Sequence, residues 1–175
     1  MKSILLFDNF YQDLESLHEL VSTLDFKESF YGEEIVDFNF IPPDSQENFC
    51  QIMAEDLEVS DNSGLFRKSY STIHFENFNG YSRYVAILAI EPTTIKFYRH
   101  EKGFKSVIEL DSPVDEFVPE FFDESKWDCY SSITLEQNQI IFLRPWMFHS
   151  LSDSLVQVFY LNTKISEEGD NNGRF

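Results

Sequence analysis

Apolar and polar positions follow a helical spacing in two segments near the start of the chain. Apolar residues recur three or four positions apart within Leu14–Leu24, which predicts a helix with Asp13 as its N-cap. The same spacing within Phe49–Leu57 predicts a second helix, capped by Asp44 or Ser45. Both helices present one apolar face, so we expect each of them to pack against a sheet.

Strand patterns occupy the rest of the chain. Ser3–Phe7 is expected to be a short buried strand. Ile35–Ile41 alternates and predicts a strand with Val36, Phe38 and Phe40 on its apolar face. After Gly64, the predicted strands are Phe66–His74, Tyr84–Ile90, Ile95–His100, Ser106–Leu110, Ser131–Leu135, Gln139–Leu143 and Leu155–Leu161.

These elements predict an α+β fold that is mainly β. Turns at intervals of about 8–12 residues are typical of a β-sandwich or barrel, and the nearly all-apolar Tyr84–Ile90 is expected to be a central strand. The length of 175 residues predicts one domain over residues 1–165. Within it, residues 1–64 form a helical brace with flanking strands and residues 65–165 form the core strands, while 166–175 is expected to be a flexible tail.

The charge and cysteine content narrow the classes of function. A net charge of −18 and a pI near 4.4 argue against nucleic-acid binding, because Lys and Arg supply most of that affinity. No apolar run approaches the roughly 20 residues that span a bilayer, and the first apolar run is too short for a signal peptide. Cys50 and Cys129 are isolated in the sequence. We therefore expect a cytoplasmic protein without a membrane partner, a disulfide or a thiolate zinc site.

One segment combines acidic and aromatic residues. Asp111–Asp128 contains seven acidic residues together with Phe117, Phe121, Phe122 and Trp127. Long irregular segments inside a domain are commonly lids or binding loops. Its charge favours a cationic partner, such as a peptide that carries Lys or Arg.

Three residues form a candidate metal site. His74 ends a predicted strand and Glu76 lies two positions further on, so strand geometry would project both side chains to the same side. His149 follows a second apolar strand. Two imidazoles and one carboxylate are the ligand set of the non-haem Fe(II) facial triad, which leaves open positions on the metal. The alternative is that each histidine is an ordinary structural residue.

Several motifs, in the same order along the chain, resemble the prolyl-hydroxylase-like branch of the Fe(II)/2-oxoglutarate-dependent oxygenase superfamily, which has many bacterial and viral members. The quoted segments are Ile4–Tyr11 (ILLFDNFY), Phe30-Tyr31-Gly32, Ile73–Glu76 (IHFE), Tyr84–Ile90 (YVAILAI), Phe97–His100 (FYRH) and Asn138–Ser150 (NQIIFLRPWMFHS). The resemblance implies a double-stranded β-helix, also called a jelly roll and similar to the cupins, braced by N-terminal helices. It implies that His74, Glu76 and His149 bind Fe(II) as the catalytic centre of a dioxygenase. Such an enzyme uses 2-oxoglutarate to hydroxylate a small-molecule or peptide substrate.

The sequence departs from the family pattern at two functional positions. Glu76 stands where the family has Asp, and the strand Leu155–Leu161 lacks the Arg or Lys that usually binds the far carboxylate of 2-oxoglutarate. The candidate replacements are Gln157 on that strand, and Lys96 or Arg99 on an earlier strand. Tyr84 is a candidate for the wall of the cofactor pocket, together with Phe97, Tyr98 and Trp146.

These departures leave two alternatives to an active dioxygenase. One is a degenerate, non-catalytic jelly roll with a binding or structural role. The other is a cupin-like metalloprotein that uses the same three ligands without 2-oxoglutarate.

Overall fold

The computed structural model describes residues 4–29, 32–68, 71–76 and 82–164. Residues 30–31 of the predicted family turn and the predicted tail 166–175 lie outside this range. The strands are β1 (Ile4–Phe7), β2 (Lys27–Ser29), β3 (Gly32–Asn39), β4 (Leu57–Val59), β5 (Leu65–Lys68), β6 (Ser82–Ala89), β7 (Thr93–His100), β8 (Trp127–Leu135), β9 (Ile140–Leu143), β10 (His149–Leu151) and β11 (Val156–Thr163). The helices are α1 (Leu14–Ser22), α2 (Ser45–Met53) and α3 (Val114–Phe117), with 3₁₀ turns η1 (Val107–Glu109), η2 (Val118–Phe122) and η3 (Glu124–Lys126).

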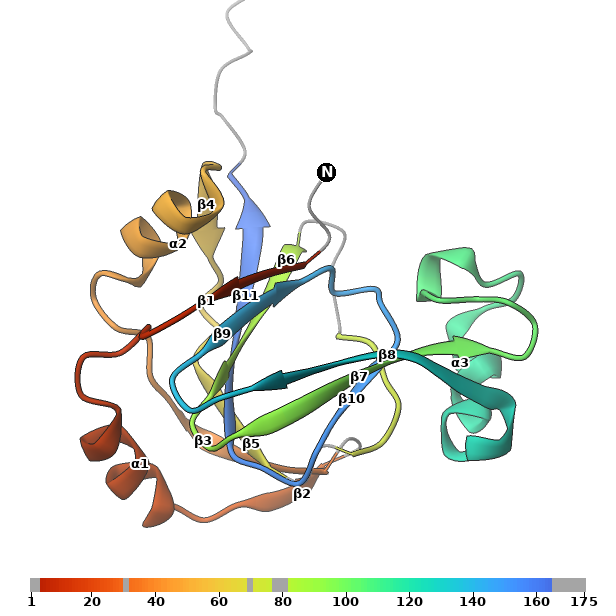
Figure 1. Ribbon diagram of the computed structural model, residues 1–175, viewed down its shortest axis with the longest axis horizontal. Helices are drawn as coiled ribbons and strands as arrows, with labels where there is room; N and C mark the ends of the chain where they lie inside the picture. The colour runs from red at the N-terminus through yellow and green to blue at the C-terminus, as the bar shows by residue number, and fades with distance from the viewer. Residues whose placement is uncertain (1–3, 30–31, 69–70, 77–81, 165–175) are drawn as a thin grey trace, which may run out of the picture.

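Two antiparallel sheets make up most of the described structure. The major sheet has the order β1-β9-β6-β11-β5-β3-β2, with β4 paired to β11, and the minor sheet has the order β10-β7-β8. Figure 1 shows the minor sheet crossing in front of the major sheet, with α1 and α2 on one side and the α3 segment on the other. The predicted mainly-β class with few helices is thus confirmed.

Apolar residues on the two faces of the major sheet pack into two separate hydrophobic cores. On one face, Phe49 of α2 is fully buried against Phe142 and Phe159 of the sheet. On the other face, Val85 and Ile87 pack against Ile95 and other residues of the minor sheet. The predicted two-sided burial of Tyr84–Ile90 is confirmed, since every residue in it is buried.

The two predicted helices are present with the predicted caps, but α1 ends at Ser22 and α2 ends at Met53, where the left-handed backbone of Ala54 closes it, so the predicted helical Leu57 lies in β4. Asp13 is the N-cap of α1 and its carboxylate accepts a hydrogen bond from the Ser16 amide. Asp44 is the N-cap of α2. Helices α1 and α2 both contribute to the core on the outer face of the major sheet, so the prediction of bracing helices holds.

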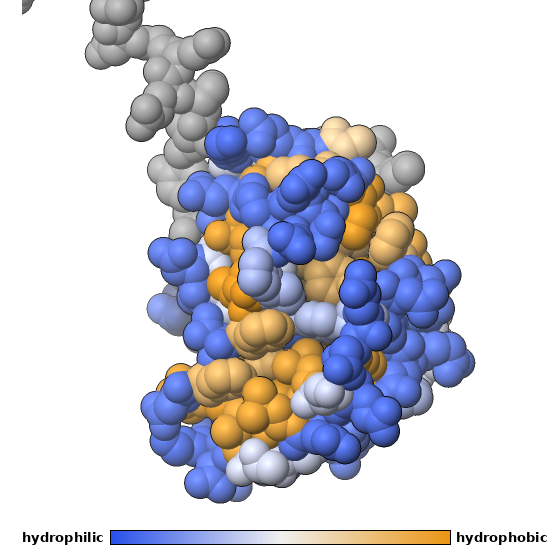
Figure 2. Space-filling view, turned by 90° about the vertical axis from the view of Figure 1, so that its left-hand side faces the viewer, coloured by the Kyte–Doolittle hydropathy of each residue, from blue (hydrophilic) through white to orange (hydrophobic). Residues whose placement is uncertain are grey.

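The predicted burial of the first strand is wrong. Among the described residues β1 pairs only with β9, at the edge of the major sheet, where Ile4, Leu6 and Phe7 are 36%, 44% and 43% exposed. The face of the molecule that carries α1, α2 and β1 shows apolar areas divided by hydrophilic side chains (Figure 2). An edge strand has a neighbour on one side only, so an apolar pattern does not ensure burial.

The predicted apolar face of Ile35–Ile41 holds only for Phe38, which is partly buried and stacks on Phe66. Ile35 is the buried residue of β3, whereas Val36 is 59% and Phe40 36% exposed. β3 pairs with β5 through a register shift between Glu34 and Asn39. Such an irregularity interrupts the alternation on which the prediction relied.

Two segments beyond β7 differ from their predictions. Ser106–Leu110 is not a strand, because Val107–Glu109 forms the 3₁₀ turn η1 and the Glu109 carboxylate accepts a hydrogen bond from the Ser106 amide. The acidic segment Asp111–Asp128 is not an irregular loop, since it forms α3, η2 and η3. Its Phe117, Phe121 and Trp127 pack with Phe148 into a third apolar cluster.

Candidate metal centre

Two chain segments bring the three predicted metal ligands together between the sheets. The backbones of His74 and His149 form an antiparallel bridge with reciprocal N–H···O bonds of 2.9 Å. Paired residues in such a bridge project to the same side, and the two ring centroids lie 4.5 Å apart. The Glu76 amide donates to the Pro145 carbonyl at 2.8 Å. Glu76 therefore lies two positions beyond His74 on the same face of the segment.

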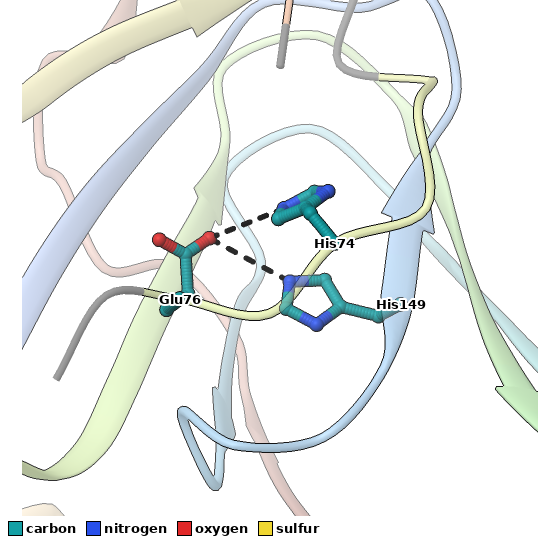
Figure 3. A group of neighbouring side chains, drawn as sticks. All are labelled: His74, Glu76 and His149. Carbon is teal, nitrogen blue, oxygen red and sulfur yellow. Dashed lines mark ion pairs between the residues drawn. The ribbon is translucent and has the colours of Figure 1, made fainter. Parts of the chain in front are cut away.

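The carboxylate of Glu76 faces both imidazoles. Its Oε1 lies 3.4 Å from His74 Nε2 and 3.6 Å from His149 Nε2 (Figure 3). One ligand atom from each residue lies within 4.8 Å of the others. The three side chains are 0–1% exposed. This arrangement surrounds one point with two nitrogens and one oxygen.

Hydrogen bonds on the outer ring nitrogens fix the orientation of the imidazoles. His74 Nδ1 lies 2.7 Å from the Thr72 carbonyl and His149 Nδ1 lies 2.8 Å from the Met147 carbonyl. A carbonyl can only accept, so each Nδ1 carries a proton, and a neutral imidazole in this orientation directs the lone pair of its Nε2 toward Glu76. In known metal sites, this bond to the second nitrogen sets the tautomer of the ligating histidine.

The protonation states of His74 and Glu76 also favour the binding of a cation. Burial, and secondly the nearby His149, lowers the pKa of His74 to about 4, so this imidazole is neutral at pH 7. Burial alone would raise the pKa of Glu76, but the adjacent Arg67 guanidinium holds it well below its usual value. Glu76 is therefore an anion beside the neutral imidazole of His74.

Two of the buried atoms that face the centre of the site have no hydrogen-bond partner among the described residues. Glu76 Oε1 and His149 Nε2 are inaccessible to water and make no hydrogen bond with the described part of the chain. Buried polar atoms in native proteins nearly always have a partner, and those that lack one require an explanation such as an ion. A divalent cation between them would accept both lone pairs. The donor set therefore fits a metal of the borderline class that includes Fe(II).

Arg67 and Tyr160 complete the polar surroundings of Glu76, and the sequence reasoning missed both. Arg67 Nη1 and Tyr160 Oη each bind Glu76 Oε2, at 2.9 Å and 2.8 Å. A partial signal was present for Tyr160, because it shares the parity of Val156 and Val158.

The structure places Gln157 and Tyr84 on the helix-covered side of the major sheet. Gln157 is fully buried, accepts a hydrogen bond from Tyr11 Oη at 2.7 Å and donates to the Phe40 carbonyl at 2.8 Å. The Tyr84 hydroxyl donates to Glu55 at 2.6 Å, and this ring belongs to the core around α1 and α2. Strand parity explains both positions, because the inward side carries Val156 and Val158 of β11 and Val85 and Ile87 of β6.

Lys96 and Arg99 are exposed on β7. Lys96 alternates with Ile95 and Phe97, which are buried between the sheets, so its side chain points outward. Arg99 pairs with Asp128 at 3.8 Å on the surface. The structure therefore brings together the three predicted metal ligands but not the four predicted cofactor-binding residues.

A groove of about 550 Å³ lies on the outer side of the minor sheet, under the acidic segment. Lys96, Tyr98 and Ser150 contribute to one wall, and Phe121, Phe122 and Glu124 contribute to the opposite wall. The hydroxyls of Tyr98 and Ser150 lie 3.1 Å apart and form a hydrogen bond with each other. Thr72 and Ile73 also line the groove, so it borders the chain segment that carries His74.

A substitution at Gln157 tests whether its side chain lies on the helix-covered face of the major sheet, away from the metal site. We expect Gln157→Leu to lower the free energy of unfolding by about 1–3 kcal/mol, because it leaves the Tyr11 hydroxyl and the Phe40 carbonyl without their partner. Metal affinity should be unchanged. Urea unfolding and calorimetric titration with Ni²⁺ measure the two effects, with the exposed Gln137→Leu as control. Loss of metal binding at unchanged stability would place Gln157 at the site after all.

Comparisons with known proteins give a fold but no family. No protein-family model matches the chain, and no curated protein matches it in sequence. Among solved structures, HygX from Streptomyces hygroscopicus with nickel, 2-oxoglutarate and hygromycin B bound is similar, with a TM-score of 0.51 and 10% identity. The match covers 93% of this chain and 84% of HygX. A second HygX structure, with nickel and 2-oxoglutarate bound, has a TM-score of 0.48 and 12% identity. The chain therefore shares its fold with a protein that binds a metal and 2-oxoglutarate.

No helix in the described residues is long and apolar enough to cross a membrane.

Proposed function

We propose that this protein is a non-haem Fe(II)- and 2-oxoglutarate-dependent dioxygenase of the hydroxylase type, built on a double-stranded β-helix. His74, Glu76 and His149 hold the metal. The convergence of a buried carboxylate and two Nε2 atoms within 4.8 Å carries the proposal. The shared fold with HygX supports it, because that protein was crystallised with a metal and 2-oxoglutarate.

The residues of this chain have separate tasks in that function. The two imidazoles and Glu76 bind the metal from one side, which leaves positions for a cosubstrate and O₂. When bound, Fe(II) would activate O₂ as the oxidant, with two electrons taken from 2-oxoglutarate, which becomes succinate and CO₂, and two from the substrate C–H bond, which becomes C–OH. The apolar residues between the sheets, including Val156 and Val158, exclude water around the reacting groups.

The substrate class follows from two observations. HygX binds the small molecule hygromycin B, and this chain carries the acidic segment Asp111–Asp128 beside the groove. We expect a small-molecule or peptide substrate that carries positive charge.

A second candidate is a cupin-like metalloprotein that does not use 2-oxoglutarate. It is favoured by the position of the cations, because Lys96 and Arg99 are exposed and Arg67 is already paired with Glu76. In this alternative, the same three ligands bind the metal.

Anaerobic titration separates the two candidates. Purified protein is loaded with Fe(II) and titrated with 2-oxoglutarate while its visible absorption is recorded. We expect a saturable charge-transfer band that is absent in His74→Ala and His149→Ala and retained in His18→Ala, which changes a histidine of α1 outside the site. Metal uptake without the band would contradict the dioxygenase and support the cupin-like protein. Absence of metal uptake would exclude both and leave a non-catalytic jelly roll.

A further inference from the structure

The second oxygen of Glu76 points away from both imidazoles (Figure 3). This atom, Oε2, accepts hydrogen bonds from Arg67 Nη1 at 2.9 Å and from Tyr160 Oη at 2.8 Å. Glu76 is 1% exposed, and Arg67 and Tyr160 are 5% and 6% exposed. The two oxygens of one buried carboxylate thus have different surroundings.

The two donors are themselves fixed by the sheet. Arg67 lies on β5, opposite Val156 of β11 and Glu34 of β3. Its Nη2 donates to Tyr160 Oη at 2.9 Å, and its Nε lies 3.5 Å from Glu34 Oε2. Tyr160 lies on β11, so three strands of the major sheet hold the group in place.

This arrangement restricts how Glu76 can bind a metal. Hydrogen bonds between a guanidinium and a carboxylate are short and strong, and breaking a buried ion pair is costly. Binding of the metal through both carboxylate oxygens would require Oε2 to leave Arg67 and Tyr160. Binding through Oε1 alone keeps both hydrogen bonds.

We propose that Arg67 and Tyr160 are positioning residues that make Glu76 a ligand through Oε1 only. The inference rests on the proposed metal site. One oxygen and two nitrogens occupy three positions of a six-coordinate metal, so three positions stay open for cosubstrate and O₂. Glu has one more rotatable bond than Asp, and the pair on Oε2 restricts that added freedom.

The test uses metal binding rather than turnover. Tyr160→Phe removes only the hydroxyl, and Arg67→Met removes the charge while keeping a long apolar chain. Arg99→Met, which changes an exposed cation of β7, is the matched control. Calorimetry gives the dissociation constant for Co²⁺, the visible spectrum of bound Co²⁺ reports its coordination, and thermal unfolding of the metal-free protein reports the fold.

We expect Arg67→Met to weaken Co²⁺ binding by roughly 10- to 100-fold and to change the Co²⁺ spectrum. Tyr160→Phe should change both in the same direction and to a smaller extent, and Arg99→Met should match the wild type. If Arg67→Met does not fold, Tyr160→Phe alone decides. Variants that are less stable but bind Co²⁺ with the wild-type affinity and spectrum would overturn the inference. Failure of the wild type to bind Co²⁺ would instead refute the proposed metal site.

Discussion

Replacing either His74 or His149 with alanine should abolish divalent metal binding. Each residue supplies one of three ligand atoms in the proposed centre, and removal of His149 leaves Glu76 and His74 alone. Calorimetric titration with Ni²⁺ should give saturable binding for the wild type and none for the variants. The stabilising effect of the metal should vanish as well; it amounts to about 2.7 kcal/mol when the free metal is at 100 times its dissociation constant.

His18→Ala is the control for this experiment. His18 lies on α1, is partly exposed and pairs with Glu91 at 3.2 Å, so its loss removes an imidazole without touching the proposed site. Circular dichroism shows whether each variant is folded. Folded His74→Ala or His149→Ala protein with wild-type Ni²⁺ affinity would show that the metal binds elsewhere.

Acidification should destabilise the metal-free protein between pH 6.5 and about 4. Burial lowers the pKa of His74 to about 4 in the native state, whereas an unfolded chain binds the proton near 6.5. Inside this window the unfolded state binds more protons than the native state, so the free energy of unfolding falls as the pH falls. The stabilising contribution is complete above 6.5 and lost by about pH 4, a change of roughly 3 kcal/mol.

Glu76 acts in the same direction at lower pH. Its native pKa lies well below the usual value, so protonation of the unfolded state below about pH 4.5 removes further stability. Urea unfolding of metal-free protein at several pH values measures the slope. His74→Gln lacks the titrating imidazole and should give a flatter profile from pH 6.5 to 5. Equal slopes for the wild type and His74→Gln would show that His74 titrates normally.

The sequence predicted the positions of most elements because their side-chain periodicity is local. Leu14, Leu17 and Val21 repeat at helical spacing and form the buried side of α1. Tyr84–Ile90 is apolar throughout and lies in the middle of the major sheet. Periodicity failed for β1 because it lies at the edge of the major sheet, and for β3 because a register shift interrupts its alternation.

In the candidate site too, some features were predictable from the sequence and others were not. His74 and Glu76 are two residues apart, so strand geometry alone places them on one side, and His149 was predicted as the third ligand from its residue type and its place after an apolar strand. No local pattern places Tyr160 near Glu76, since 84 residues separate the two, and the separation of nine residues between Arg67 and Glu76 does not by itself bring their side chains together. Lys96 and Gln157 were reasonable from residue type alone, but their strand faces direct them elsewhere.

The sequence by itself determined the mainly-β class, the two bracing helices and the donor types of the candidate centre. These features depend on side-chain periodicity and on the chemistry of imidazole and carboxylate, which a linear pattern contains. The tertiary structure decided which cation meets Glu76, which strand faces line the space between the sheets, and which apolar residues are exposed. Those outcomes depend on pairing between strands far apart in the chain, and that pairing brings Arg67 of β5 and Tyr160 of β11 to the same carboxylate oxygen.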